Sequence, residues 1–453
     1  MNMKKLIVIS FLLVAGLTSC LVGPKYTRPE MNAPQSWIEQ SSFVTRADTI
    51  TNLKWFSLFQ DTVLNHLIDS ALKNNYNLAN AVARIEQSRA SYGLAKAEMW
   101  PSIGYSVGAQ LNTPNANAFN ISGTASWEID FWGKLRHAKR AAFAQMLASE
   151  EGMKTIYTTL ISDVASYYFQ LRDLDNRMEI VERIIESRKQ YFFLVNERFK
   201  GGDVAELDKL QAEQQLLLAT ATLSSLKRQA SGVERSLNIL LGQTPRAIPR
   251  GLANTDHTNI PLIPEGLPSS LLEQRPDVRQ AELLLQAETE RIGVAQALRF
   301  PNLNLTGFLG LASADLSSLI SDGSFAGNAT ATLLGPIFSF GANKRRVEIQ
   351  RSEAVVAANN YVNTYISALG EVENALVAVK SYADEYEARR LQADAASKAL
   401  MLSQERYRNG YTGYLEVLVA EGSMFDSELQ ASALKAQQLT SYIILYKALG
   451  GGW

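Results

Sequence analysis

The chain has 453 residues, of which 46% are apolar and 20% are charged, the composition of a globular protein with ample material for a core. The formal net charge is −1, so no basic surface indicates nucleic-acid binding and we expect no nucleic-acid partner. His66, His137 and His257 are scattered, and neither a catalytic spacing nor a lysine-bearing glycine loop accompanies them. We therefore expect no enzyme, no cofactor and no metal site.

Residues 1–19 have the layout of a secretory signal peptide, because two lysines precede the apolar run Leu6–Leu17 and small residues follow it. Cys20, the only cysteine of the sequence, stands at the cleavage point. A buried structural thiol is the plain alternative. However, Leu-Thr-Ser-Cys resembles the lipobox of bacterial lipoproteins, whose cysteine is acylated, and implies a lipid anchor (palmitate) at Cys20. Leu21, in place of an aspartate, favours export to the outer membrane.

No other stretch approaches the roughly eighteen continuous apolar residues of a transmembrane helix, so any further membrane span must be made by strands. Residues 20–61 form an irregular N-terminal extension. Alanine, leucine, arginine and glutamate at helical spacing then predict the helix of a first repeat over 62–100. Trp100 precedes a proline and ends this helix, because such a residue is pushed out of the α region.

Segment 101–132 alternates with a period of two and predicts two β-strands, and 301–340 predicts two more. Strands of roughly ten alternating residues suit a transmembrane strand with one face in lipid and the other in a wet lumen. A two-sided antiparallel sheet of a soluble domain would alternate in the same way. Phe119, Trp127 and Phe131 near the strand ends resemble an aromatic girdle and favour the membrane.

Four strands cannot close a barrel, and open sheet edges are not tolerated in lipid. Bacterial barrels have even strand numbers of about eight or more. The strands therefore predict an oligomer, in which two copies would supply eight strands and three copies twelve.

Each strand pair is followed by a long helical hairpin, predicted over 133–242 and over 341–453. Each outgoing helix ends at a glycine turn and, with some 65 residues, would be roughly 100 Å long. Alanine- and leucine-rich helices of this length need lateral partners, which indicates coiled-coil-like packing. A proline-containing linker at 243–268 is expected around the outside of the helices, and 269–300 is the helix of the second repeat. The outgoing helices are predicted over about Lys134–Lys200 and about Ala342–Arg408.

The two halves of the sequence are copies. Arg198-Phe199-Lys200-Gly201-Gly202 recurs as Arg406-Tyr407-Arg408-Asn409-Gly410, a spacing of 208 residues (406 − 198). Ala95–Pro101 recurs as Ala295–Pro301, a spacing of 200 residues (295 − 95). A duplication this long means that each half builds the same supersecondary unit.

Four motifs resemble those of TolC-like outer-membrane efflux proteins, in their lipoprotein (NodT-type) branch. They are Trp55-Phe56-Ser57-Leu58-Phe59-Gln60-Asp61, Glu128-Ile129-Asp130-Phe131-Trp132-Gly133-Lys134-Leu135-Arg136, Arg275-Pro276-Asp277-Val278-Arg279-Gln280-Ala281-Glu282 and Ala448-Leu449-Gly450-Gly451-Gly452-Trp453. The resemblance covers essentially the whole mature chain. It implies a mainly α fold with membrane β-structure, in which a homotrimer forms a 12-stranded transmembrane β-barrel continuous with a periplasmic α-helical barrel.

The resemblance also implies a function. Such a trimer is the outer-membrane exit duct of a tripartite efflux system for drugs, metal ions or other small solutes. It is passive itself and works with an inner-membrane pump and a periplasmic adaptor protein. A coiled-coil surface lipoprotein that forms a stalk and no pore is the alternative, although a stalk needs no lipid-facing strand pairs.

The resemblance places the turns of the two hairpins at the periplasmic tip, where the adaptor docks and the tunnel narrows. The expected adaptor contacts are Arg198, Gly201, Gly202, Asp208, Arg406, Gly410 and Tyr411. The expected constriction is formed by Leu415, Glu416, Leu418 and Val419. Glu416 matches the first of two acidic ring positions of the family, where three symmetry copies would favour cations. Val419 occupies the second position, so the constriction is expected to be partly apolar. For any one of these residues, a solvated cap is the plain alternative.

Basic residues follow the second and fourth strands, at the start of each long helix, where cations oppose the helix macrodipole. Phosphates of outer-membrane lipid are one candidate partner, and a solvated charged face is the other. The residues concerned are Lys134, Arg136, Lys344 and Arg345.

Overall fold

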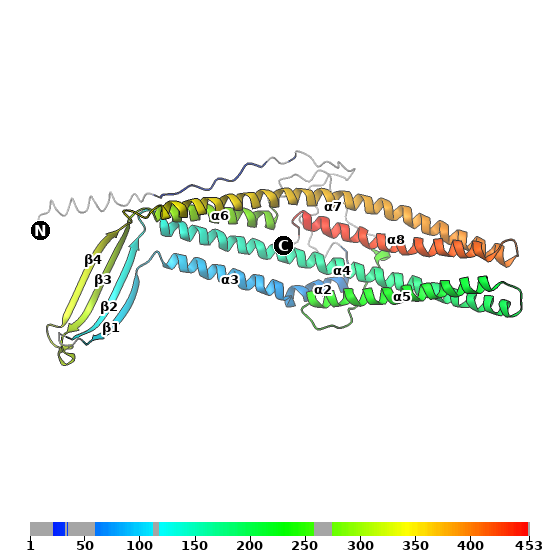
Figure 1. The fold of residues 1–453 in the computed structure, drawn as a ribbon, viewed down its shortest axis with the longest axis horizontal. Helices are drawn as coiled ribbons and strands as arrows, with labels where there is room; N and C mark the ends of the chain where they lie inside the picture. The colour runs from blue at the N-terminus through cyan, green and yellow to red at the C-terminus, as the bar shows by residue number, and fades with distance from the viewer. Residues whose placement is uncertain (1–20, 32–33, 35–58, 112–116, 258–273, 452–453) are drawn as a thin grey trace. The chain divides into compact units, whose positions relative to one another are not determined.

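The structure is a computed structural model that describes residues 21–31, 34, 59–111, 117–257 and 274–451. It is mainly helical, with one four-stranded sheet (Figure 1). In chain order the main elements are α2 (Thr62–Asn74), α3 (Tyr76–Ala97), β1 (Ser102–Gln110), β2 (Ala118–Ile129), α4 (Lys134–Lys200), α5 (Glu206–Leu240), α6 (Pro276–Ala297), β3 (Asn302–Ser313), β4 (Phe325–Leu334), α7 (Ala342–Arg408) and α8 (Tyr414–Ala448).

The chain forms two compact units. The first contains residues 81–152 and 277–364 together with the N-terminal segment, and so holds the whole sheet. The second contains residues 153–276 and 365–453, together with 33–80.

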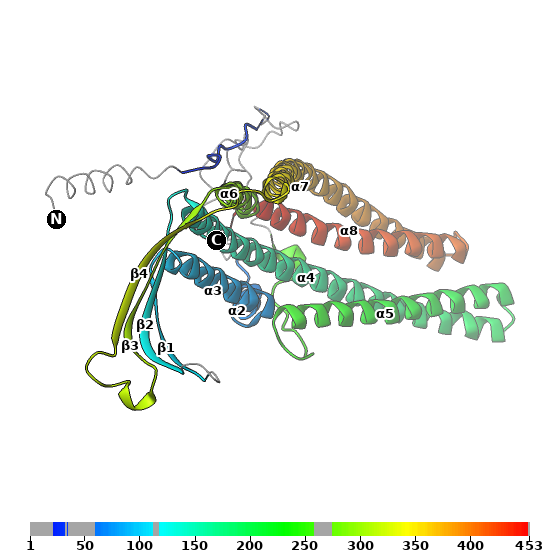
Figure 2. The same cartoon turned by 60° about the vertical axis from the view of Figure 1, so that its left-hand side comes forward.

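The sheet of the first unit is antiparallel throughout, in the order β1-β2-β3-β4 (Figure 2). β1 and β4 are therefore its edges, and each has one pairing neighbour in the described chain. Large apolar side chains of the alternating pattern are exposed on the sheet, among them Ile103 (85% exposed) and Tyr105 (88% exposed). A sheet with this much exposed apolar surface needs an apolar environment or a partner.

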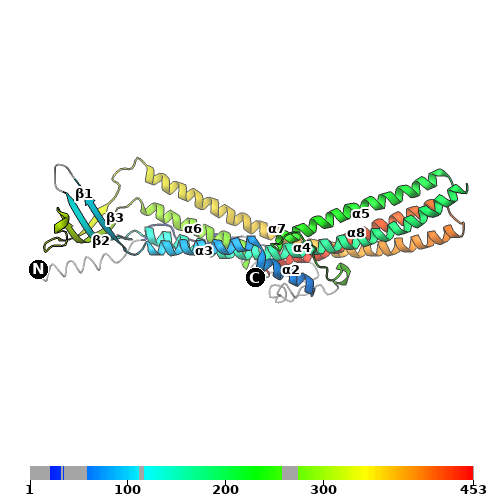
Figure 3. The ribbon, with the colours of Figure 1, turned by 90° about the horizontal axis from the view of Figure 1, so that it is seen from below.

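The rest of the first unit consists of α6 and parts of α3, α4 and α7, which lie in the order α3, α4, α6, α7 (Figures 1 and 2), and Figure 3 shows α6 beside α7 from below. Tyr92 of α3 contacts Phe143 of α4. His137 of α4 is bonded to Glu290 of α6 at 2.5 Å, where both residues are buried. The chain runs from α3 into the edge strand β1, and from the edge strand β4 into α7.

The core of the second unit includes the fully buried side chains of Tyr168, Phe169 and Leu171 of α4 and Leu439 of α8. Helices α4 and α5 form one hairpin and α7 and α8 form the other, with both turns at the same end of the unit (Figure 1). The bounds of α4 and α7 coincide with those expected from the sequence, because their apolar periodicity and their glycine stops are local signals.

The single helix expected over 62–100 is wrong, because the structure has two helices, α2 and α3, separated at Asn75. The Asn75 side chain accepts hydrogen bonds from the backbone N–H groups of Asn77 and Leu78, at 2.9 and 3.1 Å, and so caps α3. Its amide donates to the carbonyl of Leu240 at 2.9 Å. The break is thus fixed partly by α5, which is distant in sequence. Helix α6 begins at Pro276, within the expected span of 269–300.

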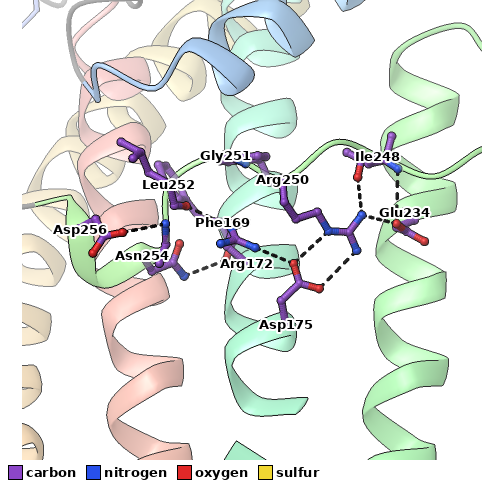
Figure 4. Close-up of polar contacts among 12 residues, drawn as sticks. Phe169, Arg172, Asp175, Glu234, Ile248, Arg250, Gly251, Leu252, Asn254 and Asp256 are labelled. Carbon is purple, nitrogen blue, oxygen red and sulfur yellow. Dashed lines mark hydrogen bonds and ion pairs between the residues drawn. The ribbon is translucent and has the colours of Figure 1, made fainter. Parts of the chain in front are cut away.

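The described part of the linker, 243–257, is fixed to α4 and α5 by a polar network (Figure 4). Arg250 donates to Asp175 of α4 at 3.0 Å and to Glu234 of α5 at 2.5 Å. The Leu252 carbonyl accepts from Arg172 of α4 at 3.0 Å. Residues 258–268 of the expected linker lie outside the described residues.

The duplication is preserved in the structure residue by residue. Helices α4 and α7 start 208 residues apart (342 − 134), α5 and α8 also 208 apart (414 − 206), and α3 and α6 200 apart (276 − 76). The strands keep the same spacings, because the pair Ser102↔Ser126 corresponds to the pair Asn302↔Leu334. Within these helices and strands, each residue of one repeat can therefore be matched to its counterpart in the other, whereas the loop between the strands is eight residues longer (208 − 200) in the second repeat.

Candidate functional site at the hairpin turns

The turn between α4 and α5 is built by two glycines. Gly202 has a φ of +81°, a left-handed conformation that favours glycine. The Asp203 N–H donates to the carbonyl of Arg198 at 2.9 Å and the Gly202 N–H to that of Phe199 at 3.0 Å, which closes the end of the helix. The expected adaptor-contact residues Gly201 and Gly202 lie exposed in this turn.

The turn between α7 and α8 repeats this backbone. Gly410 has a φ of +76°, and the Tyr411 N–H donates to the carbonyl of Arg406 at 2.9 Å. Tyr411 is 78% exposed, so its ring is bare at the turn. The adaptor-contact role of both turns stays a prediction.

Glu416, the expected acidic residue of the constriction, has partners in its own turn. One carboxylate oxygen accepts from the Thr412 hydroxyl at 2.5 Å, and the other lies 3.6 Å from the Arg406 guanidinium. Asp208, its counterpart in the first repeat, lies in the first turn of α5, where the helix dipole favours an acidic group. The Glu416 charge is thus partly balanced within the chain, and its role in a ring stays a prediction.

The apolar residues expected at the constriction form one face of α8. Leu415 and Val419, four residues apart, are each 64% exposed, and Leu418 is half-buried. Val417, on the opposite face, is buried. The two bare side chains are consistent with the apolar constriction expected from the sequence, which stays a prediction.

A tyrosine cluster that sequence reasoning missed joins the two hairpins close to their turns. The ring of Tyr191 on α4 stacks on Tyr414 of α8, with ring centroids 3.7 Å apart and planes at 9°. Its hydroxyl contacts that of Tyr407 at 3.3 Å, and Arg198 donates to the same Tyr407 hydroxyl at 3.0 Å. Burial, more than any neighbouring charge, raises the pKa of Tyr191 and of Tyr414.

A buried ion pair ties the same hairpins. Arg188 of α4 donates to Glu421 of α8 at 3.3 Å, and the two side chains are only 3% and 8% exposed. Arg188 also donates to the carbonyl of Gln215 in α5 at 2.7 Å. The pair joins residues far apart in sequence, so no local pattern announces it.

The basic residues that follow the strands differ in their partners. Lys134 pairs with Glu128 at 2.6 Å. Arg136 pairs with Asp130 at 3.1 Å, so carboxylates on either side of the last residue of β2, Ile129, balance both cations. Sequence reasoning placed these two acids in a motif without recognising them as partners. Lys344 and Arg345 contact Glu348, at 3.9 and 2.5 Å, and are 73% and 74% exposed. Contact of the four basic residues with lipid phosphate stays a prediction.

Cys20 lies outside the described residues, but the segment that follows it is placed within the first unit. The Val22 N–H donates to the carbonyl of Trp132 at 3.2 Å. The Leu21 side chain lies so close to Gly133 that a Cβ there would come within 2.4 Å of it. Tyr26 donates to Glu282 of α6 at 3.1 Å.

Among the helices of the described ranges, none combines the length and apolarity that crossing a bilayer requires. Over the same part of the chain, no three histidine, cysteine or carboxylate side chains come together in a group suited to a metal ion.

Comparison with known proteins identifies the class. The family model described as "Outer membrane efflux protein" matches residues 67–243 and 267–451. The chain is 30% identical to the cation efflux system protein CusC of Escherichia coli (strain K12) over 449 residues, which is 98% of each chain. It is 31% identical to the outer membrane protein OprJ of Pseudomonas aeruginosa over 460 residues, covering 98% of this chain and 96% of OprJ.

Solved structures agree. A crystal structure of CusC aligns with a TM-score of 0.86 at 29% identity, covering 96% of this chain and 100% of that one. The open state of the Neisseria gonorrhoeae MtrE outer membrane channel aligns with a TM-score of 0.87 at 28% identity, covering 96% and 98%. The chain belongs to the outer membrane efflux protein family. The family, fold class, efflux function and outer-membrane location expected from the sequence are confirmed, and the stalk alternative is not supported.

Proposed function

We propose that three copies of the chain assemble into a passive exit duct in the outer membrane. The observation that carries this is the four-stranded sheet, whose edge strands β1 and β4 have pairing groups to offer another chain. Three sheets give twelve strands, an even number within the range of closed bacterial barrels. The matched structures of CusC and MtrE, described as a transmembrane channel and an outer membrane channel, support a duct in the outer membrane.

The proposed duct works with a periplasmic adaptor protein that contacts the hairpin turns, and with an inner-membrane pump that supplies the energy. The chain itself performs no catalysis in this proposal. Relatives that are almost equally identical to this chain are named for different solutes. CusC, 30% identical, is named as a cation efflux protein, and TtgI, 29% identical, as a toluene efflux protein. We therefore propose that the pump selects the solute, which is a metal ion, drug or other small molecule.

The proposed assembly also has a lipid anchor at Cys20. The residues directly after it, Leu21 and Val22, lie against Gly133 and Trp132, where β2 leads into α4. An acyl chain attached one residue earlier would therefore start close to the end of the barrel strand. Cys20→Ala is expected to abolish labelling of the purified protein by radioactive palmitate.

The proposal is tested with the full chain purified from outer membranes in detergent. A mass of three protomers and step-like conductance in planar bilayers are expected. Because the tunnel can be closed at rest, Glu416→Ala and Arg188→Ala variants are recorded beside the wild type. A monomer, or the absence of conductance from every variant, would contradict the proposed duct.

A further inference from the structure

An aromatic pair joins the two repeats inside the chain. The indole of Trp132, which follows β2, stacks on Phe300, which precedes β3, with centroids 4.5 Å apart and planes at 22°. The Trp132 N–H donates to the carbonyl of Pro301 at 2.8 Å. This contact closes the seam where β2 of the first repeat pairs with β3 of the second.

The counterparts of these two aromatic residues lie on the two open edges. Phe340 corresponds to Trp132 (340 − 132 = 208), and each precedes a glycine with a φ of +84°. Trp100 corresponds to Phe300 (300 − 100 = 200), and each precedes a proline. Phe340 is 90% exposed and Trp100 is 69% exposed, whereas both members of the internal pair are half-buried.

We propose that Phe340 of one protomer stacks on Trp100 of the next, and that this stack repeats the internal Trp132–Phe300 contact at every seam between chains. Trp100 leads into β1 and Phe340 follows β4, the two edges of the sheet. The occupant of the bare edge is thus a second copy of this chain, because only that copy presents the matching surface. The inference rests on the proposed oligomeric duct and specifies its contacts.

A second pair of counterparts points to the same seam. His137 packs on Gly293, where an added Cβ would lie 2.5 Å from the imidazole ring. The counterpart of Gly293 is Gly93, which faces open space near the C-terminal end of α3. The counterpart of His137 is Arg345, which is 74% exposed. A glycine within an exposed helix lowers stability relative to alanine, so its presence is explained if a neighbouring chain approaches there.

The duplication also fixes the strand register across the seam. The spacings of 208 and 200 residues hold within the strands, as the matched pairs of β1–β2 and β3–β4 show. The internal pairs Ser122↔Gly310 and Ser126↔Thr306 of β2–β3 can therefore be transferred to β4 and the β1 of a neighbour. They become Thr330 opposite Gln110 and Leu334 opposite Ser106.

The test uses four single cysteines at these positions, combined in pairs in the full chain. Gln110→Cys with Thr330→Cys, and Ser106→Cys with Leu334→Cys, are the matched pairs, in which directly opposed Cβ atoms lie about 5 Å apart. Gln110→Cys with Leu334→Cys, and Ser106→Cys with Thr330→Cys, are mismatched by four residues, or roughly 13 Å. Within one chain β1 and β4 are three strand spacings apart, roughly 14 Å, so a disulfide must join two chains.

Oxidation of outer membranes that contain each variant is expected to give covalent dimers and trimers from the matched pairs and monomers from the mismatched pairs and single cysteines. The oligomer mass and the conductance of the same preparations separate the two proposals. A conducting trimer whose matched pairs stay monomeric, or whose mismatched pairs cross-link equally, would overturn the register alone. Loss of the trimer in all variants and in the wild type would overturn the duct itself.

The aromatic stack has a separate readout in the temperature at which the trimer dissociates on a gel. Phe340→Ala and Trp100→Ala are each expected to lower this temperature, and the double variant is expected to lower it no further than the larger single effect. Phe340→Trp, unlike Phe340→Ala, is expected to keep the dissociation temperature of the wild-type trimer. Additive losses, as expected for rings that face lipid independently, would contradict the stack.

Discussion

The two hairpin turns have the same backbone and different side-chain contacts. Both place a glycine at positive φ and return a hydrogen bond to an arginine carbonyl, Arg198 in one and Arg406 in the other. The Arg198 side chain crosses to Tyr407 of the second hairpin, whereas Arg406 stays with Glu416 in its own turn. The counterpart of Tyr407 in the first hairpin is Phe199, which has no hydroxyl to accept such a hydrogen bond from Arg406.

The same asymmetry continues along the helices. α4 supplies Arg188, which pairs with Glu421 of α8. The counterparts of these residues are Ala396 in α7 and Glu213 in α5, and they cannot form the pair in reverse. Duplication has thus kept the framework of each hairpin, while the polar contacts that join the hairpins depend on residues present in one copy only.

The largest expected effect follows from breaking the buried pair. Arg188→Ala leaves the Glu421 carboxylate buried without its countercharge, with the Ser187 hydroxyl at 3.3 Å as a remaining donor. It is expected to lower the free energy of unfolding by about 3–5 kcal/mol. Glu213→Ala, at the counterpart of Glu421, is the matched control and is expected to change it by less than about 1 kcal/mol. Thermal unfolding followed by circular dichroism measures both. Equal losses from the two variants would show that the asymmetry has no energetic consequence.

A smaller and symmetrical effect is expected from the shared turn backbone. Gly202→Ala and Gly410→Ala each place a side chain at positive φ, with open space around it, so backbone strain alone is expected to cost about 1–2 kcal/mol in each. Gly413→Ala, at a φ of −78°, restores the residue of the first repeat, Ala205, and serves as the control. Unequal melting shifts of the first two variants would show that the turns are not equivalent.

Much of the fold could be predicted because its signals are local. The alternation over 101–132 and 301–340 and the glycine stops at Gly201 and Gly410 lie within a few residues of what they specify. The break at Asn75 could not be predicted, because Asn75 adds a bond to the distant Leu240 carbonyl to its local capping bonds.

The candidate site divides in the same way. Its turns follow from sequence, but the stack of Tyr191 on Tyr414 joins two helices from different repeats. The counterparts of these tyrosines are Ala399 and Glu206, so the only signal was a departure from the repeat pattern. Such a departure marks a position without identifying its partner.

The tyrosine cluster predicts a pH dependence. Because burial raises the pKa of Tyr191, the folded state favours the neutral hydroxyl, and its contribution to stability is complete below the ordinary tyrosine pKa of about 10 and lost as the pH rises above it. Tyr191→Phe is expected to cost about 1 kcal/mol at neutral pH, through loss of the contact with Tyr407, and to reduce the alkaline loss. Melting temperatures measured from about pH 8 to about pH 11, a range that brackets the ordinary tyrosine pKa, test this expectation. An unchanged alkaline slope in the variant would assign the titration to other groups.

The smallest effect on stability and the most specific effect on function are expected at Glu416. The Glu416 side chain is 42% exposed, so solvent screens its contacts with Arg406 and Thr412. Glu416→Ala is therefore expected to change the free energy of unfolding by less than about 1 kcal/mol. In a trimer, however, three such carboxylates would lie near the proposed constriction and attract cations. Glu416→Ala is therefore expected to weaken cation block or cation selectivity in planar bilayers, whereas Asp208→Ala, at the counterpart position of the first hairpin, is expected to leave both unchanged. If both variants keep wild-type selectivity, the bonds to Arg406 and Thr412 already neutralise Glu416, and the apolar pair Leu415 and Val419 is left as the constriction.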